Sequence, residues 1–300
     1  MKISSFVKFA AFGAGTVMFR GRKPIIGEVI LTDRCNLACM HCAVNNITSV
    51  IYPYVQISRE MRLLYDQGVR ILLFFGGEPF LWQDSGKTLK DLAVEAKEMG
   101  FLYVIVVTNG TFPLDLPSAD MIMVSLDGGR EKHNEIRGDT YDRIMGNIRA
   151  AASPNICLYM ALNKINKDEI STVCSVAAVE PNVRSVSFNF HTPYPGTEQL
   201  SLSRSEKAQC CGVIENMMDK GIPILNLRSA FPYLINNNFP VPCYQCVIIE
   251  DGKQSICGRC IDIPGLCSKC GYFFAAEYSL AFQGNIRVII EMLRTYLKYT

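Results

Sequence analysis

After Pro24 the chain alternates short apolar runs, rich in β-branched residues, with longer stretches of helical periodicity. This alternation is typical of repeated strand–helix units around a parallel sheet. Six strands are predicted, at residues 27–31, 70–75, 101–108, 121–126, 156–162 and 184–190. Helices are expected between and after them, near residues 56–68, 86–99, 140–152, 167–179 and 203–220.

Six such units form about three quarters of an eight-stranded barrel. We therefore predict an α/β fold, a partial (β/α)6 TIM-like barrel with a small cysteine-rich C-terminal extension. In such barrels the chemistry lies in the loops after the carboxyl ends of the strands. The predicted strands end in polar or glycine-rich residues, among them Thr-Asp-Arg-Cys, Gly-Gly-Glu-Pro and Thr-Asn-Gly, so we expect one site that collects these loops.

The alternation stops after Gly221, where a stretch rich in Pro and Asn leads into a cysteine-dense region. We predict three parts: an apolar and basic N-terminal segment (1–23), the barrel (24–221) and a C-terminal module (222–300) that closes with a helix. That helix is predicted to begin after Gly284-Asn285 and to pack on its own domain, with membrane contact through its basic face as the alternative. Its expected apolar face consists of Ile286, Ile289, Leu293 and Tyr296.

Composition excludes several classes of protein. The chain has 300 residues, 49% of them hydrophobic and 19% charged, with 30 Lys and Arg against 28 Asp and Glu. These proportions argue against disorder and against a nucleic-acid partner bound through bulk positive charge. Thirteen cysteines are many, but an odd number in a chain of this size does not suit a small disulfide scaffold. Metal ligation is the better hypothesis.

Residues 9–19 form an uncharged stretch between basic residues. Eleven residues are too few to span a membrane, and no small-residue cleavage site of a signal peptide follows. We therefore expect a cytoplasmic protein. The segment 1–23 is expected to pack on the domain as a first helix. The alternative is an interfacial helix, which would place the protein peripherally on the inner face of the membrane.

Cys35, Cys39 and Cys42 form a C-x3-C-x2-C pattern directly after the first predicted strand. Three thiolates can hold three irons of a cubane cluster, which leaves the fourth iron open to a substrate or cofactor. A structural zinc site requires a fourth Cys or His. His41 is crowded by its cysteine neighbours, but spacing alone leaves zinc as an alternative.

The segment Cys-Asn-Leu-Ala-Cys-Met-His-Cys at 35–42, together with Gly-Gly-Glu-Pro at 76–79, resembles the radical S-adenosylmethionine (SAM) superfamily. The resemblance covers residues 27 to about 191. It implies that the open iron of a [4Fe-4S] cluster chelates SAM, and that an electron from the cluster cleaves SAM to methionine and a 5′-deoxyadenosyl radical. The radical removes a hydrogen from the substrate. An external electron donor such as flavodoxin or ferredoxin is the implied partner.

The resemblance also assigns residues to SAM. Gly76, Gly77 and Glu78 would offer backbone groups and a carboxylate to the SAM ammonium, because glycines permit close approach and an anion complements a cation. The resemblance implies six further contacts: Pro79 within the second motif, His41 against the adenine, Ser125 and Asp127 at the ribose, Asn163 at the ribose or carboxylate, and Arg137 at the SAM carboxylate. For Asp127 and Asn163 the alternative function is turn formation. For Arg137 the alternative is a surface ion pair.

Six further cysteines follow the pattern C-x2-C-x10-C-x2-C-x6-C-x2-C. The run 247–257 predicts a hairpin turned by Asp-Gly and resembles an element of SPASM and twitch extensions, which hold auxiliary iron-sulfur clusters. No cysteine follows residue 270, so two complete four-cysteine clusters are excluded here. We expect one auxiliary [4Fe-4S] cluster bound by four of these residues, with a zinc ribbon as the alternative. The six are Cys243, Cys246, Cys257, Cys260, Cys267 and Cys270.

The remaining cysteines, Cys157, Cys174, Cys210 and Cys211, are interpreted as small buried hydrophobic residues. The chain is predicted to be a radical SAM enzyme. Its substrate is expected to be a peptide, as for many members with auxiliary clusters, or a lipid or isoprenoid intermediate, as in the hopanoid-modifying branch that the N-terminal stretch resembles. The alternative is an iron-sulfur protein that transfers electrons or activates a partner without modifying a small substrate.

Overall fold

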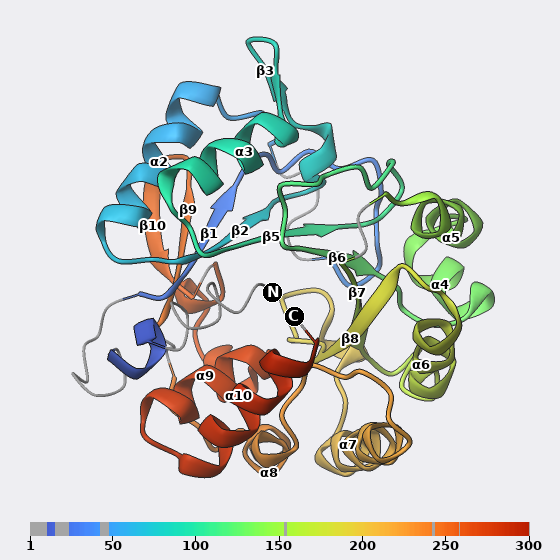
Figure 1. Ribbon diagram of the computed structural model, residues 1–300. Helices are drawn as coiled ribbons and strands as arrows, with labels where there is room; N and C mark the ends of the chain where they lie inside the picture. The colour runs from blue at the N-terminus through green and yellow to red at the C-terminus, as the bar shows by residue number, and fades with distance from the viewer. Residues whose placement is uncertain are drawn as a thin grey trace.

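The computed structural model describes residues 11–15, 24–42, 48–152, 155–241, 244–257 and 259–299. A curved sheet of eight strands forms its centre, in the order β10-β9-β1-β2-β5-β6-β7-β8 (Figure 1). All six predicted strands are present, each within two residues of its predicted bounds. The strands are β1 (Ile26–Ile30), β2 (Ile71–Phe75), β5 (Tyr103–Thr108), β6 (Met121–Ser125), β7 (Ile156–Leu162), β8 (Val183–Phe190), β9 (Cys246–Glu250) and β10 (Lys253–Ile256).

Helices cover the outside of the curved sheet, as expected for a partial barrel (Figure 1). Local signals place their ends: Thr88 and Asp91 form a capping box at α3, Ser203 and Glu206 form one at α7, and Gly100 ends α3 in the left-handed conformation. The helices are α2 (Tyr54–Asp66), α3 (Leu89–Met99), α4 (Arg130–Arg137), α5 (Tyr141–Ala150), α6 (Ile170–Val179), α7 (Arg204–Asp219), α8 (Phe231–Ile235), α9 (Phe273–Phe282) and α10 (Ile286–Tyr299). Short elements complete the fold: η1 (Pro79–Leu81), η2 (Glu198–Leu200), η3 (Arg228–Ala230), η4 (Arg259–Asp262), η5 (Cys267–Lys269) and a hairpin of β3 (Gln83–Asp84) and β4 (Lys87–Thr88).

The two faces of the sheet differ in how fully they are buried. On β5 the outward residues Val104 and Val106 are completely buried beneath the helices. The alternate residues Tyr103, Ile105 and Val107 are only partly buried, because they face a cavity inside the barrel. The sheet is therefore packed on its outer face and partly open on its inner face.

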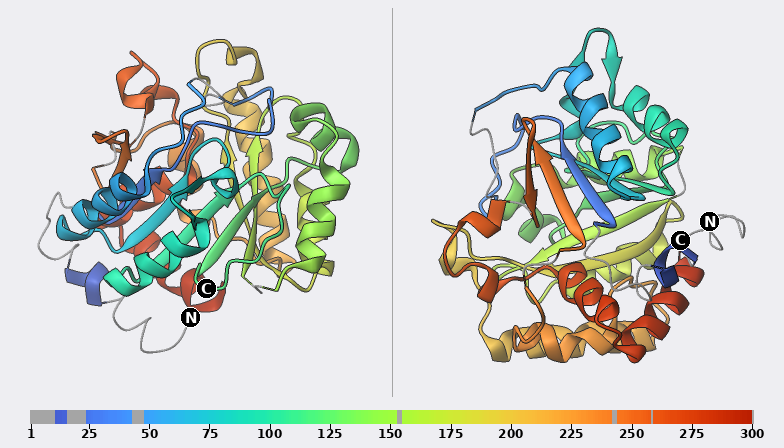
Figure 2. Two further views of the ribbon diagram at one scale, coloured as in Figure 1. Left: turned by 90° about the horizontal axis from the view of Figure 1, so that it is seen from above. Right: turned by 90° about the vertical axis from the view of Figure 1, so that its left-hand side faces the viewer.

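The predicted hairpin at 247–257 is present as β9 and β10, and it continues the barrel sheet. β9 pairs in parallel with β1, with Ile26 opposite Cys246 and Val29 opposite Ile249. Asp251 and Gly252 turn the hairpin with positive φ angles of 50° and 72°, as a type I′ turn requires. Figure 2 shows the hairpin beside β1. The division of the chain at residues 23 and 221 stays a prediction.

The closing helix α10 is rotated relative to its predicted apolar face. Val288 is completely buried, and Ile289 packs against the core. Tyr296 also points inward, where it lines the barrel cavity, but Ile286 is 70% exposed and Leu293 is 42% exposed, so the predicted face is half wrong. The other four cysteines, Cys157, Cys174, Cys210 and Cys211, are confirmed as buried.

Of the N-terminal segment 1–23, only residues 11–15 are described; they are helical, and Phe12 packs against the core. The predicted alternatives for the whole segment depend on residues outside the described ranges. Among the described residues, no helix combines the length and the apolar character that crossing a membrane requires.

Candidate active site

The loop with the first three cysteines is anchored at its two ends. Asp33 directly follows the first strand and is buried, and its carboxylate accepts hydrogen bonds from the backbone NH of Thr48 and of Val50, the latter at 2.9 Å. The buried Thr32 donates its hydroxyl to the carbonyl of Val50. These bonds fix the base of the loop, so the cysteines project over the carboxyl end of β1.

The cysteine sulfurs lie beside hydrogen-bond donors. Cys35 Sγ accepts from Leu37 N at 3.4 Å and from Asn109 Nδ2 at 3.7 Å. Cys39 Sγ lies 3.8 Å from Arg137 Nη1. Burial raises the pKa of both thiols, and the neighbouring Cys42 raises it further. Clustered cysteine sulfurs can bind the irons of an iron-sulfur cluster, and NH donors beside those sulfurs adjust the reduction potential of such a cluster.

Gly76 and Gly77 allow the second motif to pack directly on the cysteine loop. A Cβ on Gly76 would lie 2.2 Å from the carbonyl oxygen of Thr32, and one on Gly77 would lie 2.3 Å from that of Arg34. Gly77 N donates to the same Thr32 oxygen at 2.7 Å, and Glu78 N donates to Arg34 O at 2.9 Å. These NH groups bind the cysteine loop, so the motif has a structural function of its own.

The Glu78 carboxylate is completely buried and accepts three hydrogen bonds from the chain. Its donors are Phe80 N at 3.0 Å, Thr108 Oγ1 at 2.7 Å and Asn109 N at 2.8 Å. Burial raises its pKa to about 7 despite these bonds. Glu78 therefore joins the end of β2 to the end of β5, and its predicted contact with the SAM ammonium stays a prediction. Pro79, also buried, is the first residue of η1.

Arg137 connects three of the predicted site residues. Its Nε lies 2.5 Å from Asp127 Oδ2, its Nη2 lies 3.3 Å from His41 Nε2, and its Nη1 contacts Cys39. The side chains of Arg137 and Asp127 are 10% and 0% exposed, so Arg137 does form an ion pair, but a buried one rather than one on the surface. Its contact with the SAM carboxylate stays a prediction. Burial opposes ionisation of Asp127, but Arg137, His41 and His133 outweigh it and lower its pKa.

His41 lies inside this cluster, in contact with both Arg137 and His191. Burial lowers the pKa of His41 to about 4, so its ring is neutral at pH 7. The ring lies edge-on to His191 with centroids 6.4 Å apart. Within the described part of the chain, the buried His41 Nδ1 has no hydrogen-bond partner, as expected of an atom that meets a ligand.

The other two predicted SAM contacts lie at neighbouring strand ends. Ser125 is buried at the end of β6. Asn163 is buried after β7, where its Oδ1 accepts from Ile165 N at 2.8 Å and its Nδ2 donates to Ala161 O at 3.1 Å. These bonds are those of a turn-forming Asn. Whether Ser125 and Asn163 also contact SAM stays a prediction.

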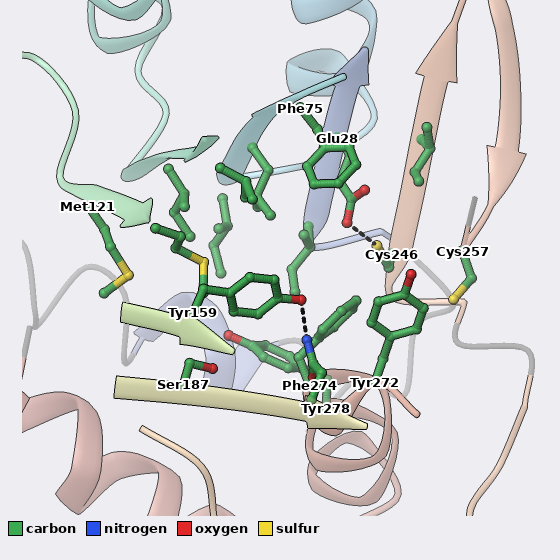
Figure 3. Close-up of a pocket in the computed structure, with 18 of the residues that line it drawn as sticks. Glu28, Phe75, Met121, Tyr159, Ser187, Cys246, Cys257, Tyr272, Phe274 and Tyr278 are labelled. Atoms are coloured by element: carbon green, nitrogen blue, oxygen red, sulfur yellow. Dashed lines mark hydrogen bonds between the residues drawn. The ribbon is translucent and has the colours of Figure 1, made fainter. Parts of the chain in front are cut away.

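Four of the six C-terminal cysteines surround one small cavity, beside Thr192 and Tyr272. Cys246 does not line this small cavity: it is buried in β9, and its Sγ donates to Glu28 Oε1 at 3.6 Å inside the barrel (Figure 3). Cys243 lies outside the described residues. Among the described residues, no three Cys, His, Asp or Glu side chains are close enough to share a single metal ion. An iron-sulfur cluster does not require such closeness, because each of its thiolates binds a different iron. The four cysteines are Cys257, Cys260, Cys267 and Cys270.

Inside the barrel, β1, β2, β5 and β6 face α9 and α10 across a cavity of about 220 Å³. Glu28 of β1, Tyr159 of β7 and Asn189 of β8 supply polar groups. Figure 3 shows Glu28 and Tyr159 together with Cys246. The cavity lies inside the strands whose carboxyl ends carry the cysteine loop and Asp127. A molecule in it would therefore lie beside the candidate SAM site.

The helix α4, which carries His133 and Arg137, was not predicted, because Ile136 is the only large apolar residue of its eight and no period is visible. Asn109 lies in the polar Thr-Asn-Gly end of β5, but its own function was not predicted. Glu28 was not predicted as a functional residue either. A single acid in an otherwise apolar strand was the available signal.

The fold and this site define a class of protein: a partial parallel barrel whose first strand-end loop presents three thiols beside the buried ion pair of Arg137 and Asp127. Residues 29–176 match the family profile described as the Radical SAM superfamily. The chain is therefore an enzyme of the radical SAM superfamily, whose members use a [4Fe-4S] cluster and SAM.

Two relatives illustrate the similarity in sequence. Fe-coproporphyrin III synthase of Methanosarcina barkeri is 28% identical over 210 residues, which cover 63% of this chain and 50% of that protein. GTP 3′,8-cyclase of Campylobacter jejuni is 24% identical over 306 residues, which cover 93% of this chain and 90% of the relative. The chain thus spans half the length of the first relative and nearly all of the second.

Solved structures share the fold. SuiB of Streptococcus suis bound to S-adenosylmethionine superposes with a TM-score of 0.66 at 12% identity, over 95% of this chain and 70% of SuiB. The enzyme anSMEcpe with bound AdoMet and Cp18Cys peptide superposes with a TM-score of 0.56 at 14% identity, over 91% of this chain and 84% of that chain. At these identities the likeness concerns the fold alone.

Proposed function

We propose that this enzyme cleaves SAM at a cluster held by Cys35, Cys39 and Cys42, and acts on a substrate that lies in the barrel cavity. The bound cluster would supply the electron that releases a 5′-deoxyadenosyl radical from SAM. The observation that carries the proposal is the convergence of Cys39, His41 and Asp127 on Arg137, at strand ends next to the cavity.

The chain's own groups have separate tasks in this proposal. Arg137 places a fixed positive charge beside Cys39, where it offsets thiolate charge and can pair with the SAM carboxylate. Asn109 donates to Cys35 and also to Asn36 Oδ1 at 2.9 Å, which orients the loop. His41 Nδ1, which has no hydrogen-bond partner among the described residues, is available to the adenine.

A second cluster is proposed at Cys257, Cys260, Cys267 and Cys270, because these four residues surround one cavity whereas Cys246 faces Glu28. A zinc ion in the same place is the alternative. Tyr272 borders both this small cavity and the barrel cavity. A cluster there would therefore lie close to the substrate.

The substrate is proposed to be a peptide or a lipid or isoprenoid intermediate, and the electron donor a protein such as flavodoxin or ferredoxin. A crystal structure of SuiB contains a bound precursor peptide, SuiA, which supports the first class. The apolar character of the cavity supports the second. An electron carrier without SAM chemistry stays the alternative function. That function gives no role to the buried side chains around Arg137.

The test is anaerobic reconstitution followed by reduction with dithionite and measurement of 5′-deoxyadenosine by liquid chromatography. Wild-type protein is expected to form it slowly from SAM without substrate, and a Cys35→Ala/Cys39→Ala/Cys42→Ala variant is expected to form none. A Cys174→Ala variant is the matched control, because Cys174 is buried on α6 away from the motif. If fully reconstituted wild type forms no 5′-deoxyadenosine, the electron-carrier alternative is favoured.

A further inference from the structure

The walls of the barrel cavity are largely hydrocarbon. Ile71 and Leu73 come from β2, Ile105 from β5, Met123 from β6 and Phe274 from α9. These side chains are contributed by both the sheet and the C-terminal helices, so the cavity is apolar on opposite sides. A ligand in such a cavity is stabilised in proportion to the apolar surface of the ligand and of the walls that binding removes from water.

The described lining of the cavity offers no basic side chain to an anion. None of the described residues that line it is Lys, Arg or His, whereas three of them, Glu28, Glu250 and Glu277, are acidic. Phosphate and carboxylate ligands are normally held by Arg or Lys. A triphosphate or a polyacid in this cavity would be buried against carboxyl groups without a counter-charge, which is strongly unfavourable.

Several polar groups of the cavity lie around Glu28 and Tyr159, which Figure 3 labels. Glu28 accepts from Cys246, Tyr159 is bonded to Asn189, and the hydroxyls of Tyr194 and Tyr272 lie 3.4 Å apart. Burial raises the pKa of Glu28 to about 7, so this carboxyl can both donate and accept near neutral pH. These groups suit a hydroxyl or another uncharged polar group of a ligand.

We infer that the barrel cavity binds a neutral, hydrocarbon-rich molecule of the lipid-alcohol or isoprenoid class, with its one polar group directed to Glu28 and Tyr159. The inference rests on the proposed function, since this molecule would be the substrate of the radical. It selects one of the two proposed substrate classes. The inferred ligand also differs from the GTP for which some relatives are named. GTP carries a triphosphate, and the described lining residues of this cavity include no cationic group to bind it.

The test measures binding without SAM or reductant. The neutral fluorophore N-phenyl-1-naphthylamine is added to reconstituted protein, and farnesol, farnesyl diphosphate and GTP compete for it. Farnesol is expected to displace the probe at a concentration at least about tenfold lower than farnesyl diphosphate, the equivalent of about 1.4 kcal/mol, and GTP is expected not to displace it. Displacement by farnesyl diphosphate or GTP as effective as that by farnesol would overturn the inference.

Variants connect the probe to the cavity. Ile105→Trp and Met123→Trp, which fill the cavity from neighbouring strands, are each expected to reduce probe binding, and Val94→Trp on the exposed side of α3 is the matched control. Two cavity variants are used because one of them could fold incorrectly, which circular dichroism would detect. The other variant then still tests the inference. Unchanged probe binding in a folded cavity variant contradicts the inference. If the protein binds farnesol with the expected selectivity but does not cleave SAM, only the proposed function is contradicted.

A second inference concerns α10, whose outer face carries an apolar stripe. Ile286, Ile290, Leu293 and Leu297 are 70%, 43%, 42% and 58% exposed. Their spacing of four, three and four residues places them along one side of the helix. Side chains of this size rarely form such a row in contact with water.

Basic residues border this stripe. Arg287, Arg294 and Lys298 are exposed on α10, whereas its one acid, Glu291, is turned inward and accepts from the backbone NH groups of Arg228 and Ser229 at 2.7 and 2.9 Å. The outward face is therefore apolar and positively charged. This combination is typical of helices that lie in the interface of an anionic bilayer.

We propose that the outer face of α10 binds the surface of an anionic lipid bilayer. Flotation with vesicles of phosphatidylcholine and phosphatidylglycerol is expected to recover the protein, and vesicles of phosphatidylcholine alone are expected to recover much less. Added salt should weaken the binding, because it screens the basic residues. Ile290→Glu/Leu293→Glu is expected to abolish flotation, whereas Val179→Glu on α6, where the wild-type side chain is 74% exposed, is expected to leave it intact.

A chain that lacks residues 1–23 separates the two candidate membrane elements, since α10 remains in it. Flotation that survives this deletion but not Ile290→Glu/Leu293→Glu assigns binding to α10. If the double substitution leaves flotation unaffected, the proposal is wrong. It is also wrong if wild-type protein does not bind vesicles and instead forms a dimer in size-exclusion chromatography that the double substitution dissociates. In the latter case the stripe is an interface between two copies.

Discussion

Arg137 Nε and Asp127 Oδ2 lie 2.5 Å apart in a site where both side chains are almost completely buried. The two residues come from different elements, the end of α4 and the loop after β6, so their ion pair fixes α4 over the strand ends. Through Cys39 the same guanidinium reaches the loop after β1. One buried cation thus connects two loops of the site with the end of α4.

Breaking this pair should be costly because it leaves a buried charge without a partner. We expect Arg137→Gln and Asp127→Asn each to lower the free energy of unfolding by about 3–5 kcal/mol, measured by urea denaturation, and the double variant to lose less than the sum of the two. Both should also weaken SAM binding. Arg149→Gln removes an ion pair with Glu180 whose Arg is 64% exposed, and is expected to cost only about 0–1 kcal/mol. Additive effects of the two buried substitutions would refute a direct coupling.

Gly77 should tolerate no side chain, because the cysteine loop occupies the space of a Cβ. Gly77→Ala places a methyl group 2.3 Å from the Arg34 carbonyl and must move one loop or the other. We expect a loss of at least about 2 kcal/mol in unfolding free energy and a lower iron content after reconstitution. Gly146→Ala in α5, where the new Cβ meets nothing within 4 Å, should be neutral or stabilising. Equal iron content and stability in both variants would show that the close approach is unimportant.

Glu78 can be examined by two substitutions that separate its contacts from its charge. Glu78→Ala leaves Thr108 Oγ1 and the NH groups of Phe80 and Asn109 without their acceptor, at about 1–3 kcal/mol for each group that stays unsatisfied. Glu78→Gln keeps an acceptor oxygen and should be the more stable variant. If the carboxylate binds the SAM ammonium, Glu78→Gln still weakens SAM binding in equilibrium dialysis while iron content is unchanged. Normal SAM affinity would restrict Glu78 to a structural role.

The auxiliary site makes a prediction about metal content. If one cluster occupies each cysteine site, Cys35→Ala/Cys39→Ala/Cys42→Ala should retain about half of the wild-type iron, and Cys257→Ala/Cys260→Ala should lose the other half. Cys246→Ala should retain all of the iron, because its thiol contacts Glu28 instead. About one zinc per chain, with no iron left in the triple variant, would identify a zinc ribbon. Iron lost from Cys246→Ala would return that residue to the ligand set.

Much of the fold could be predicted from sequence because the six predicted strands contain short apolar runs and the long helices between them have one apolar face. The helix α9 is buried on nearly all sides, so it lacks that periodicity and was not predicted. The hairpin at 247–257 was also predicted, but its pairing with β1 was not, since a pairing between segments so far apart in the chain leaves no local pattern. The motif cysteines and the Gly-Gly-Glu-Pro turn stand out for their spacing. The bonds of Glu78 and the contact of Cys246 with Glu28 depend on which strands become neighbours, which no single segment encodes.

Glu277 provides a pH test that is distant from the cysteine motif at 35–42. It is buried on α9 and accepts from Leu227 N at 2.8 Å, and burial raises its pKa to about 8. Between about pH 4.5, its ordinary pKa, and pH 8 the folded protein keeps this proton while the unfolded chain releases it, so rising pH destabilises the fold across that window. Glu277→Gln keeps an acceptor for Leu227 and removes the titration. Relative to wild type it should therefore gain about 3–5 kcal/mol between about pH 5 and pH 8.5 in urea denaturation. A stability difference that is constant with pH would mean that Glu277 is ionised in the folded protein.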